Sequence, residues 1–471
     1  MNPTQTRWTH PPGGRIEPGA TRPIQGTAKL TLHTFATTVA SNVALGGVSI
    51  VIARSLGPSE KGSYDLILAT AALLATLLGL SLPTGVTYVV ARGDAAVRPI
   101  IGRVSGLVVV QAILAVGLLV GIRNSPVAFA FIPPGLGDFV MWATIVLVGL
   151  TLLQSTFRAV VVGRRKIVLA NRLDLFGRLS QLILFAAAWG TLWRLGREPR
   201  VFHFVWLAVA SVAITCVLYF RAAYAEAGTT PSDEKAIGKV WRYALTCHAG
   251  NIAQFLNYRV AVFLVGYFLG TTAVGHYTLA MTLSQLHWLV AQAAATVLLP
   301  VVAARSGAGE NSAVHVAAVS RMVVAITCVT ALATAIISGT LVPWVFGAEF
   351  EGSLLPLYLL LPGVVAFVPS IVLASYFGGH GRPSVHLKGS ATGLVTMLVL
   401  SVWLVPRFGT AGAAVATSAA YLLGSAVLLV AFTRSTRLSA RDVVVPQVCD
   451  GTAIVRALID RVGAGSRVSG G

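Results

Sequence analysis

Polar side chains recur at helical spacing inside one apolar segment, residues 242–268. His248, Asn251 and Gln254 follow one another every third residue, and Arg259 comes soon after them. At about 3.6 residues per turn, His248, Asn251 and Arg259 share one helix face, and Gln254 lies at its edge. Amides and an imidazole can replace water around hydroxyl groups, and a guanidinium binds phosphate through paired hydrogen bonds. The pattern predicts a surface for a polar ligand that carries phosphate.

A plainer interpretation exists for Arg259. A long basic side chain can snorkel from a membrane span toward the headgroups at one face of the bilayer. Snorkelling would not explain the imidazole and amide on the same helix face, so we favour an interior cavity. A charged side chain near the bilayer centre costs about 2.5–3.5 kcal/mol on insertion scales, and such residues usually face a cavity.

A second polar stripe lies in residues 30–53. It consists of two i, i+4, i+8 rows, which are His33, Thr37, Ser41 and, beside it, Thr34, Thr38, Asn42. The hydroxyl groups could instead bond only to the backbone of their own helix, an interpretation that is equally good. Gln285, in the apolar segment 274–303, adds a further polar group. Together these segments predict a wet, neutral-to-cationic lumen.

Charged residues near segment ends leave two interpretations open. Arg158 and Arg178 could extend the lumen, although ordinary anchoring at the membrane surface is favoured for both. Asp65 and Asp174 fall at the predicted starts of spans, where a carboxylate stabilises a helix N-terminus, and capping is the favoured role. No Asp or Glu then remains in the middle of any span, which counts against a cation-coupled exporter.

The elements that must position these residues are long apolar blocks. The 471 residues are 55% hydrophobic and only 11% charged, and the mean hydropathy is +0.79. Blocks of about 20 apolar residues are long enough to cross a bilayer as helices. We therefore expect an all-α polytopic membrane protein. The twelve predicted spans are 30–53, 64–91, 100–122, 139–161, 174–193, 201–223, 242–268, 274–303, 316–346, 352–378, 388–405 and 410–432.

A short hinge sequence occurs twice. Leu56, Gly57, Gly62, Tyr64 and Leu66 recur at a constant offset of 213 as Leu269, Gly270, Gly275, Tyr277 and Leu279. Arg92 with Arg305, and Gly196 with Gly409, keep the same offset. An even number of spans separates equivalent points, so the halves run in parallel and predict a site between two lobes that alternate in access. The predicted domains are a disordered arm 1–29, a first lobe 30–226, a linker 227–240, a second lobe 241–432 and a basic tail 433–471.

The net charge of +19 does not indicate nucleic acid, because most Lys and Arg fall on loops at the side of the N-terminus. This asymmetry places both termini in the cytoplasm and the protein in the cytoplasmic membrane. No phosphate-binding loop and no metal-spaced His/Cys/Asp cluster is present, so no cofactor is expected.

Two stretches carry a family resemblance. ARSLGPSEKGSYDL at 53–66 and PRFGTAGAAVATS at 406–418 resemble the polysaccharide-biosynthesis flippases, the Wzx-type members of the multidrug/oligosaccharidyl-lipid/polysaccharide (MOP) exporter superfamily. The resemblance covers most of residues 30–432 and implies two six-helix bundles in a V, as in MATE transporters. It further implies a polyprenyl-linked glycan as substrate, the bilayer as host, and glycosyltransferases or a polymerase of the same pathway as candidate partners.

Three alternatives remain. A cation-coupled multidrug exporter would share the fold, and His33 or His248 could then carry protons. A membrane-embedded glycan polymerase or ligase would need catalytic groups on sizeable loops, and the outward loops here are short, so no enzyme is expected. A purely structural membrane partner is the third alternative.

Overall fold

The computed structural model describes residues 24–92, 97–225, 235–307, 312–382 and 384–445. All regular elements within these ranges are helical, which confirms the all-α prediction. The α-helices are α1 (Ile24–Leu78), α2 (Leu82–Ala91), α3 (Val97–Arg123), α4 (Gly137–Gly163), α5 (Ile167–Arg194), α6 (Val201–Ala225), α7 (Lys235–Gln285), α8 (Trp288–Gly307), α9 (Ala313–Phe346), α10 (Leu354–Gly379), α11 (Ser384–Thr436) and α12 (Ala440–Val444). Short 3-10 helices occupy Ala128–Ala130 (η1) and Ala348–Ser353 (η2).

The number of membrane spans agrees with the prediction. In the described part of the chain, 9 helices are long and apolar enough to cross a membrane. Three of them, α1, α7 and α11, are each divided by a glycine with non-helical torsion angles. The divided helices supply two spans each, and α2 and α8 complete the second spans of α1 and α7. The twelve predicted spans are therefore confirmed.

The dividing glycines confirm the repeat in three dimensions. Gly57 has φ 67° and ψ 179°, and Gly270 has φ 79° and ψ −175°, so the two hinges share one backbone conformation. This region of torsion space is essentially restricted to glycine. The more distant pair agrees as well, because Gly196 has φ 62° and Gly409 has φ 61°.

Several element boundaries differ from the predicted ones. Helix α1 begins at Ile24, within the segment assigned to the N-terminal arm, and α7 begins at Lys235, within the predicted linker. The predicted span 64–91 is interrupted where Leu80 and Ser81 adopt left-handed conformations. Apolar composition continues through this break, so hydropathy gives no sign of it. Residues 1–23, 226–234 and 446–471, which hold most of the predicted arm, linker and tail, lie outside the described ranges.

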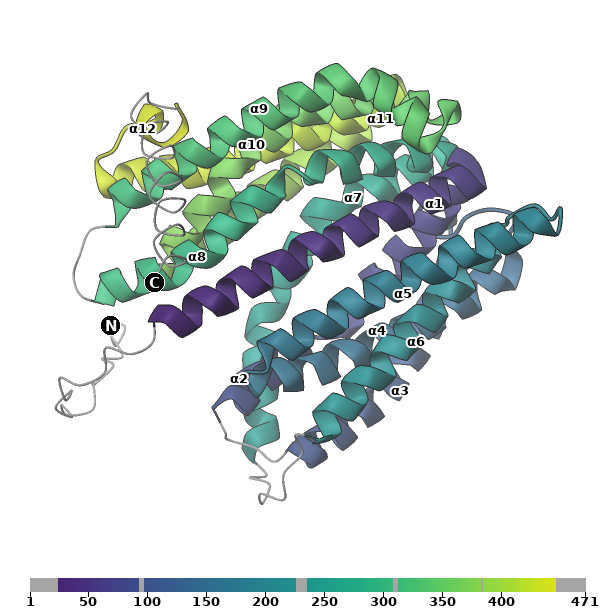
Figure 1. Ribbon diagram of the computed structural model, residues 1–471, viewed down its shortest axis with the longest axis horizontal. Helices are drawn as coiled ribbons and strands as arrows, with labels where there is room; N and C mark the ends of the chain where they lie inside the picture. The colour runs from purple at the N-terminus through teal and green to yellow at the C-terminus, as the bar shows by residue number, and fades with distance from the viewer. Residues whose placement is uncertain (1–23, 93–96, 226–234, 308–311, 383, 446–471) are drawn as a thin grey trace, which may run out of the picture.

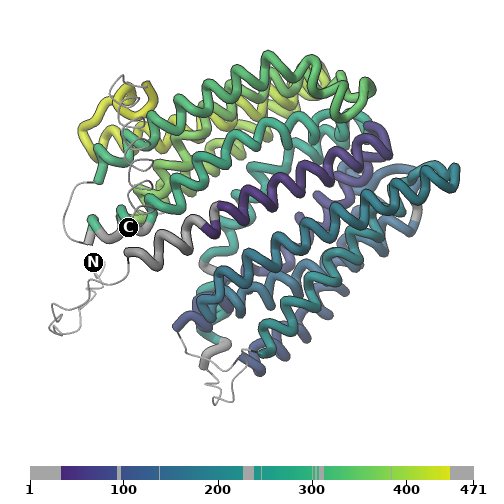
Figure 2. The backbone as a smooth tube through the Cα atoms, viewed as in Figure 1, coloured from purple at the N-terminus to yellow at the C-terminus, as the bar shows by residue number. Residues whose placement is uncertain are grey.

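The helices form two bundles. Figure 1 shows α3 to α6 on one side and α8 to α11 on the other, with α1 between them. The bundles diverge toward the end where α1 begins and α12 lies, here called the terminus end, and the backbone trace in Figure 2 shows the same V. The opposite end, with Gly57 and Gly270, is called the glycine end.

The two halves meet closely at the glycine end. A Cβ atom on Gly62 would lie 1.8 Å from the Thr271 carbonyl oxygen, and one on Gly275 would lie 2.0 Å from that of Pro58. Adding the offset of 213 to Gly62 and Pro58 gives Gly275 and Thr271, so the two contacts are equivalent in the repeat. The crossing is therefore symmetric about the pseudo-two-fold axis. Only glycine allows such an approach of two backbones.

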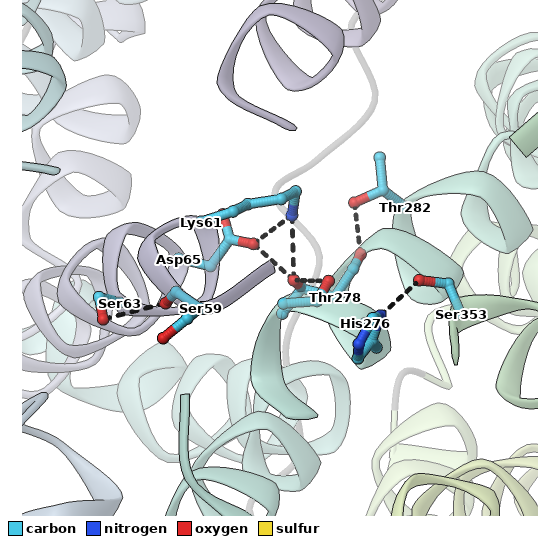
Figure 3. Close-up of polar contacts among 9 residues, drawn as sticks. Ser59, Lys61, Ser63, Asp65, His276, Thr278, Thr282 and Ser353 are labelled. Carbon is cyan, nitrogen blue, oxygen red and sulfur yellow. Dashed lines mark hydrogen bonds and ion pairs between the residues drawn. The ribbon is translucent and has the colours of Figure 1, made fainter. Parts of the chain in front are cut away.

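A polar cluster secures this crossing (Figure 3). The Lys61 ammonium binds the Asp65 carboxylate at 2.5 Å, and the Thr278 hydroxyl donates to the same carboxylate at 2.5 Å. Asp65 and Thr278 are themselves repeat equivalents, so they meet at the pseudo-two-fold axis. Lys61 is only 3% exposed. Separating the halves at this end would therefore expose the buried Lys61 and break the hydrogen bonds that Thr278 makes with Lys61 and Asp65.

Candidate functional site

A cavity of about 580 Å³ lies within the first bundle, among α1, α4, α5 and α6. Its walls are predominantly polar and come from the middle and terminus-end halves of these helices. The lining residues are Thr37, Thr38, Ser41, Asn42, Leu45, Thr151, Gln154, Arg158, Asn171, Asp174, Gly177, Arg178, Gln181, Ser211, Val212 and Thr215. Every one of them belongs to the first half of the chain, whereas the sequence predicts a site shared by both halves.

A hydrogen-bond network at the cavity wall holds one of the two cavity arginines, whose side chain is 44% exposed. Arg158 Nη2 lies 2.9 Å from Asp174 Oδ2, and Arg158 Nε lies 3.0 Å from the same oxygen. The hydroxyl of Tyr219, a fully buried residue, donates to Asp174 Oδ1 at 2.7 Å and also lies 2.8 Å from the Ala170 carbonyl oxygen. The network fixes the carboxylate on α5 and, through it, the guanidinium on α4.

The predicted capping role of Asp174 is wrong. Helix α5 begins at Ile167 after Lys166, so Asp174 lies well inside the helix and projects into the cavity. The prediction began the span at the apolar run and left out the polar residues before it. One of those residues, Asn171, lines the cavity, so hydropathy did not mark this turn as part of the span. The related prediction concerned the middle of the spans, and Asp174, the eighth of the 28 residues of α5, lies nearer to one end of its helix.

Asp65 does not cap a helix either. The helix residues after the Gly57 hinge carry it into the crossing of the two halves, where it binds Lys61 and Thr278. Both carboxylates thus make long-range contacts that local sequence does not specify.

Arg178 lies on α5 and is exposed to the cavity. Among the described residues it has no salt-bridge partner, in contrast to Arg158. Its neighbour along the cavity wall, Gln181, donates to the hydroxyl of the buried Tyr64 at 3.2 Å. The cavity therefore presents one guanidinium held by a carboxylate and a second that is available to a ligand.

Four of the cavity hydroxyls, those of Thr37, Thr38, Ser211 and Thr215, give their protons to the protein. The donations are Thr37 to His33 O at 2.9 Å, Thr38 to Thr34 O at 2.8 Å, Ser211 to Gly177 O at 3.1 Å and Thr215 to Ser211 O at 2.8 Å. Asn42 and Asn171 likewise donate through their side-chain nitrogens, to Thr38 O at 2.9 Å and Thr34 Oγ1 at 3.0 Å. On these four hydroxyl groups, oxygen lone pairs remain to accept hydrogen bonds from a ligand. The sequence left two roles open for Thr37 and Thr38, which were bonding to the backbone of their own helix or lining a lumen. Both residues do both.

The predicted site residues fall into two sets. Those that line the cavity are Thr37, Thr38, Asn42, Arg158 and Arg178, while His33, His248, Asn251, Gln254, Arg259 and Gln285 lie outside its lining. His248 Nδ1 and Asn251 Nδ2 lie 3.3 Å and 2.8 Å from Ser81 Oγ, at the break between α1 and α2. Gln254 and Arg259 are exposed on α7. A substrate role for either set stays a prediction.

Sequence reasoning missed a polar stripe on α5. Asn171, Asp174, Arg178 and Gln181 follow at i, i+3, i+7 and i+10, which is one helix face. The same test of periodicity that singled out residues 30–53 would have found this row. Ser211 and Thr215, on α6, complete the opposite wall.

Comparison with known proteins points to a transport fold. A family model described as polysaccharide biosynthesis protein matches residues 51–355. No curated protein matches the chain. Three of the similar solved structures are lipid II flippase MurJ in an inward closed conformation, an inward-facing MATE family multidrug transporter of the MOP superfamily, and the Vibrio cholerae MATE transporter VcmN in a bent form.

The similarity to these structures extends over nearly the whole chain. The TM-score with MurJ is 0.69, with 12% identity over 86% of this chain and 87% of that one. The MATE transporter gives 0.60, with 13% identity over 84% and 94%, and VcmN gives 0.57, with 14% identity over 88% and 98%. Identities this low establish the fold alone.

Proposed function

The chain belongs to the polysaccharide biosynthesis protein family, and from this premise we propose that it is a flippase for lipid-linked glycans. Its cargo would be an oligosaccharide joined to a polyprenyl carrier by a phosphate or pyrophosphate, moved across the cytoplasmic membrane. The fold supports this proposal, because two parallel six-helix lobes can expose one site to each side of a membrane in turn.

The chemistry of the cavity is the observation that carries the proposal. Sugar hydroxyls are hydrogen-bond donors, and each would cost a few kcal/mol if moved bare through hydrocarbon. The cavity offers oxygen acceptors on Thr37, Thr38, Ser211 and Thr215, together with the guanidiniums of its two arginines. Acceptors suit the glycan and guanidiniums suit the phosphate. The apolar polyprenyl tail needs no such surface and would remain in lipid.

The conformation fits one step of alternating access. The bundles diverge at the terminus end, while the glycine end is closed by the Gly62–Gly275 crossing. With the termini in the cytoplasm, as the distribution of basic residues predicts, the headgroup would enter from the cytoplasmic side. Release would require the crossing at the glycine end to separate.

A cation-coupled multidrug exporter is the second candidate. Asp174 favours it, because a carboxylate in a cavity within the membrane can bind a proton or a cation, and MATE transporters share the fold. The carboxylate is, however, already occupied by Arg158 and Tyr219. A drug-efflux assay with a sudden change of pH or sodium would reveal this activity. A glycan polymerase or ligase is a weaker candidate, because the described loops at the glycine end are short.

The proposal is tested by deleting the gene and measuring lipid-linked sugars separately in each membrane leaflet. A flippase defect would accumulate the precursor in the cytoplasmic leaflet and return to normal when the gene is restored. Accumulation in the outer leaflet would indicate a polymerase or ligase instead. A normal distribution in both leaflets would contradict the proposed function.

A further inference from the structure

The charged groups of the cavity do not balance. Its lining contains two guanidiniums, those of Arg158 and Arg178, and a single carboxylate, that of Asp174. The remaining lining residues are neutral, so the cavity wall carries one net positive charge. Arg172, a further charged residue of α5, and Lys166, which precedes the helix, are not part of the lining.

Asp174 is held in this wall by contacts with residues of two neighbouring helices. Three of its contacts go to Arg158, at 2.9 Å, 3.0 Å and 3.3 Å, and a fourth comes from the Tyr219 hydroxyl at 2.7 Å. Tyr219 has no exposed surface, so its ring cannot swing aside. A ligand therefore meets a carboxylate whose position is fixed by α4, α5 and α6 together.

Resting on the proposed function, we propose that Asp174 determines specificity by limiting the cavity to a headgroup with one negative charge. The phosphodiester of a carrier joined to sugar through a single phosphate has this charge. It would be neutralised by Arg178, while Arg158 and Asp174 neutralise each other. A pyrophosphate linkage carries two charges, and the second would face the Asp174 carboxylate without a free cation. Like charges close together in a partly desolvated site repel strongly.

A sugar carboxylate offers the same chemistry as a phosphodiester. An acidic sugar on a carrier whose phosphate stays at the membrane surface would also bring one negative charge into the cavity. The inference therefore names a single anionic group, and the experiment must separate its two sources.

The test measures binding to the full-length protein in nanodiscs. The two lipid probes are glucosyl farnesyl phosphate, a phosphodiester, and glucosyl farnesyl pyrophosphate. Methyl glucuronide is added as a soluble anionic competitor, and methyl glucoside is its neutral control. We expect the wild-type protein to bind the phosphodiester about tenfold more tightly than the pyrophosphate, equivalent to about 1.4 kcal/mol. Competition by methyl glucuronide but not methyl glucoside would assign the charge to an acidic sugar. Competition by neither would assign it to the linkage.

The decisive variant is Asp174→Asn, which removes the charge and keeps the shape. The preference for the phosphodiester over the pyrophosphate should disappear or reverse in this variant, because the cavity would then carry two positive charges. Asp174→Glu should restore it. Asp138→Asn is the matched control, since the Asp138 carboxylate also pairs with an arginine, Arg123, but lies outside the cavity lining. Its preference should equal that of the wild type.

The outcomes separate this inference from the proposed function. A wild-type protein that binds the pyrophosphate equally well or better would overturn the inference and leave the flippase proposal intact. The same holds if Asp174→Asn binds both probes with the wild-type ratio. Failure of the wild-type protein to bind either lipid probe would contradict both proposals.

Discussion

At the scale of single residues, the two cavity arginines differ in what they can offer a ligand. Arg158 uses Nε and Nη2 to bind Asp174. Arg178 has no salt-bridge partner among the described residues and lies on the same wall as Asn171 and Gln181. A guanidinium without a carboxylate is the better phosphate ligand, because binding the anion breaks no existing ion pair.

We predict that Arg178→Ala lowers transport of the lipid-linked sugar about tenfold or more, since charge-assisted hydrogen bonds are worth about 1.5–3 kcal/mol. Arg178→Lys should retain part of the activity, because it keeps the charge and loses the paired hydrogen bonds. The measurement is the amount of precursor in each leaflet at matched protein levels. Arg172→Ala serves as control, because Arg172 is exposed on the same helix but does not line the cavity. Normal transport by Arg178→Ala would remove Arg178 from the site.

The sequence predicted the kinds of residue in the site better than their partners. Helical periodicity identified Thr37, Thr38 and Asn42, and all three line the cavity. Partners such as Tyr219 for Asp174, or Ser81 for His248, lie 45 and 167 residues away along the chain. Local periodicity contains no information about such contacts.

At the scale of elements, glycine hinges join paired membrane spans in both halves. Gly57 and Gly270 hold the same torsion angles, and helical structure resumes immediately after each of them. Gly270 has nothing within 4 Å of its would-be Cβ, so only its backbone conformation requires glycine.

Gly270→Ala should therefore reduce stability by about 1–3 kcal/mol, which is the usual cost of placing a residue with a Cβ in this region of torsion space. The free energy of unfolding of the purified protein in detergent is the quantity to measure. Gly250→Ala is the matched control, because Gly250 lies on the same helix, is helical and also has open space around its would-be Cβ. It should be neutral or slightly stabilising. Equal effects of the two substitutions would contradict the strained-hinge account.

Elements were predictable where composition or repetition marked them. Apolar blocks gave the number of spans, and the offset of 213 gave hinges that the torsion angles confirm. The break at Leu80 and Ser81 was not predictable, because apolar composition continues through it and neither residue type marks a left-handed conformation. The prediction also missed that α5 begins at Ile167, because a hydropathy criterion treats a polar helical turn that faces a cavity as a loop.

At the scale of the whole molecule, one end of the bundle is closed and the other diverges. The closed end contains the crossing of Gly62 and Gly275, the buried Lys61–Asp65 pair and a contact of 3.3 Å between the hydroxyls of Ser59 and Thr271. Transport by alternating access requires this end to open while the terminus end closes. A covalent bond across it should therefore hold the protein in the conformation described here.

The most direct measurement is headgroup movement in proteoliposomes made from a Ser59→Cys, Thr271→Cys variant in which the native cysteines are replaced by alanine. A labelled polyprenyl-phosphate sugar is followed across the bilayer, with and without a membrane potential, before and after reduction of the new disulfide. The account predicts no movement while the halves are cross-linked and recovery of movement on reduction. Movement at the same rate in the cross-linked protein, or none in the reduced protein under either condition, would contradict it.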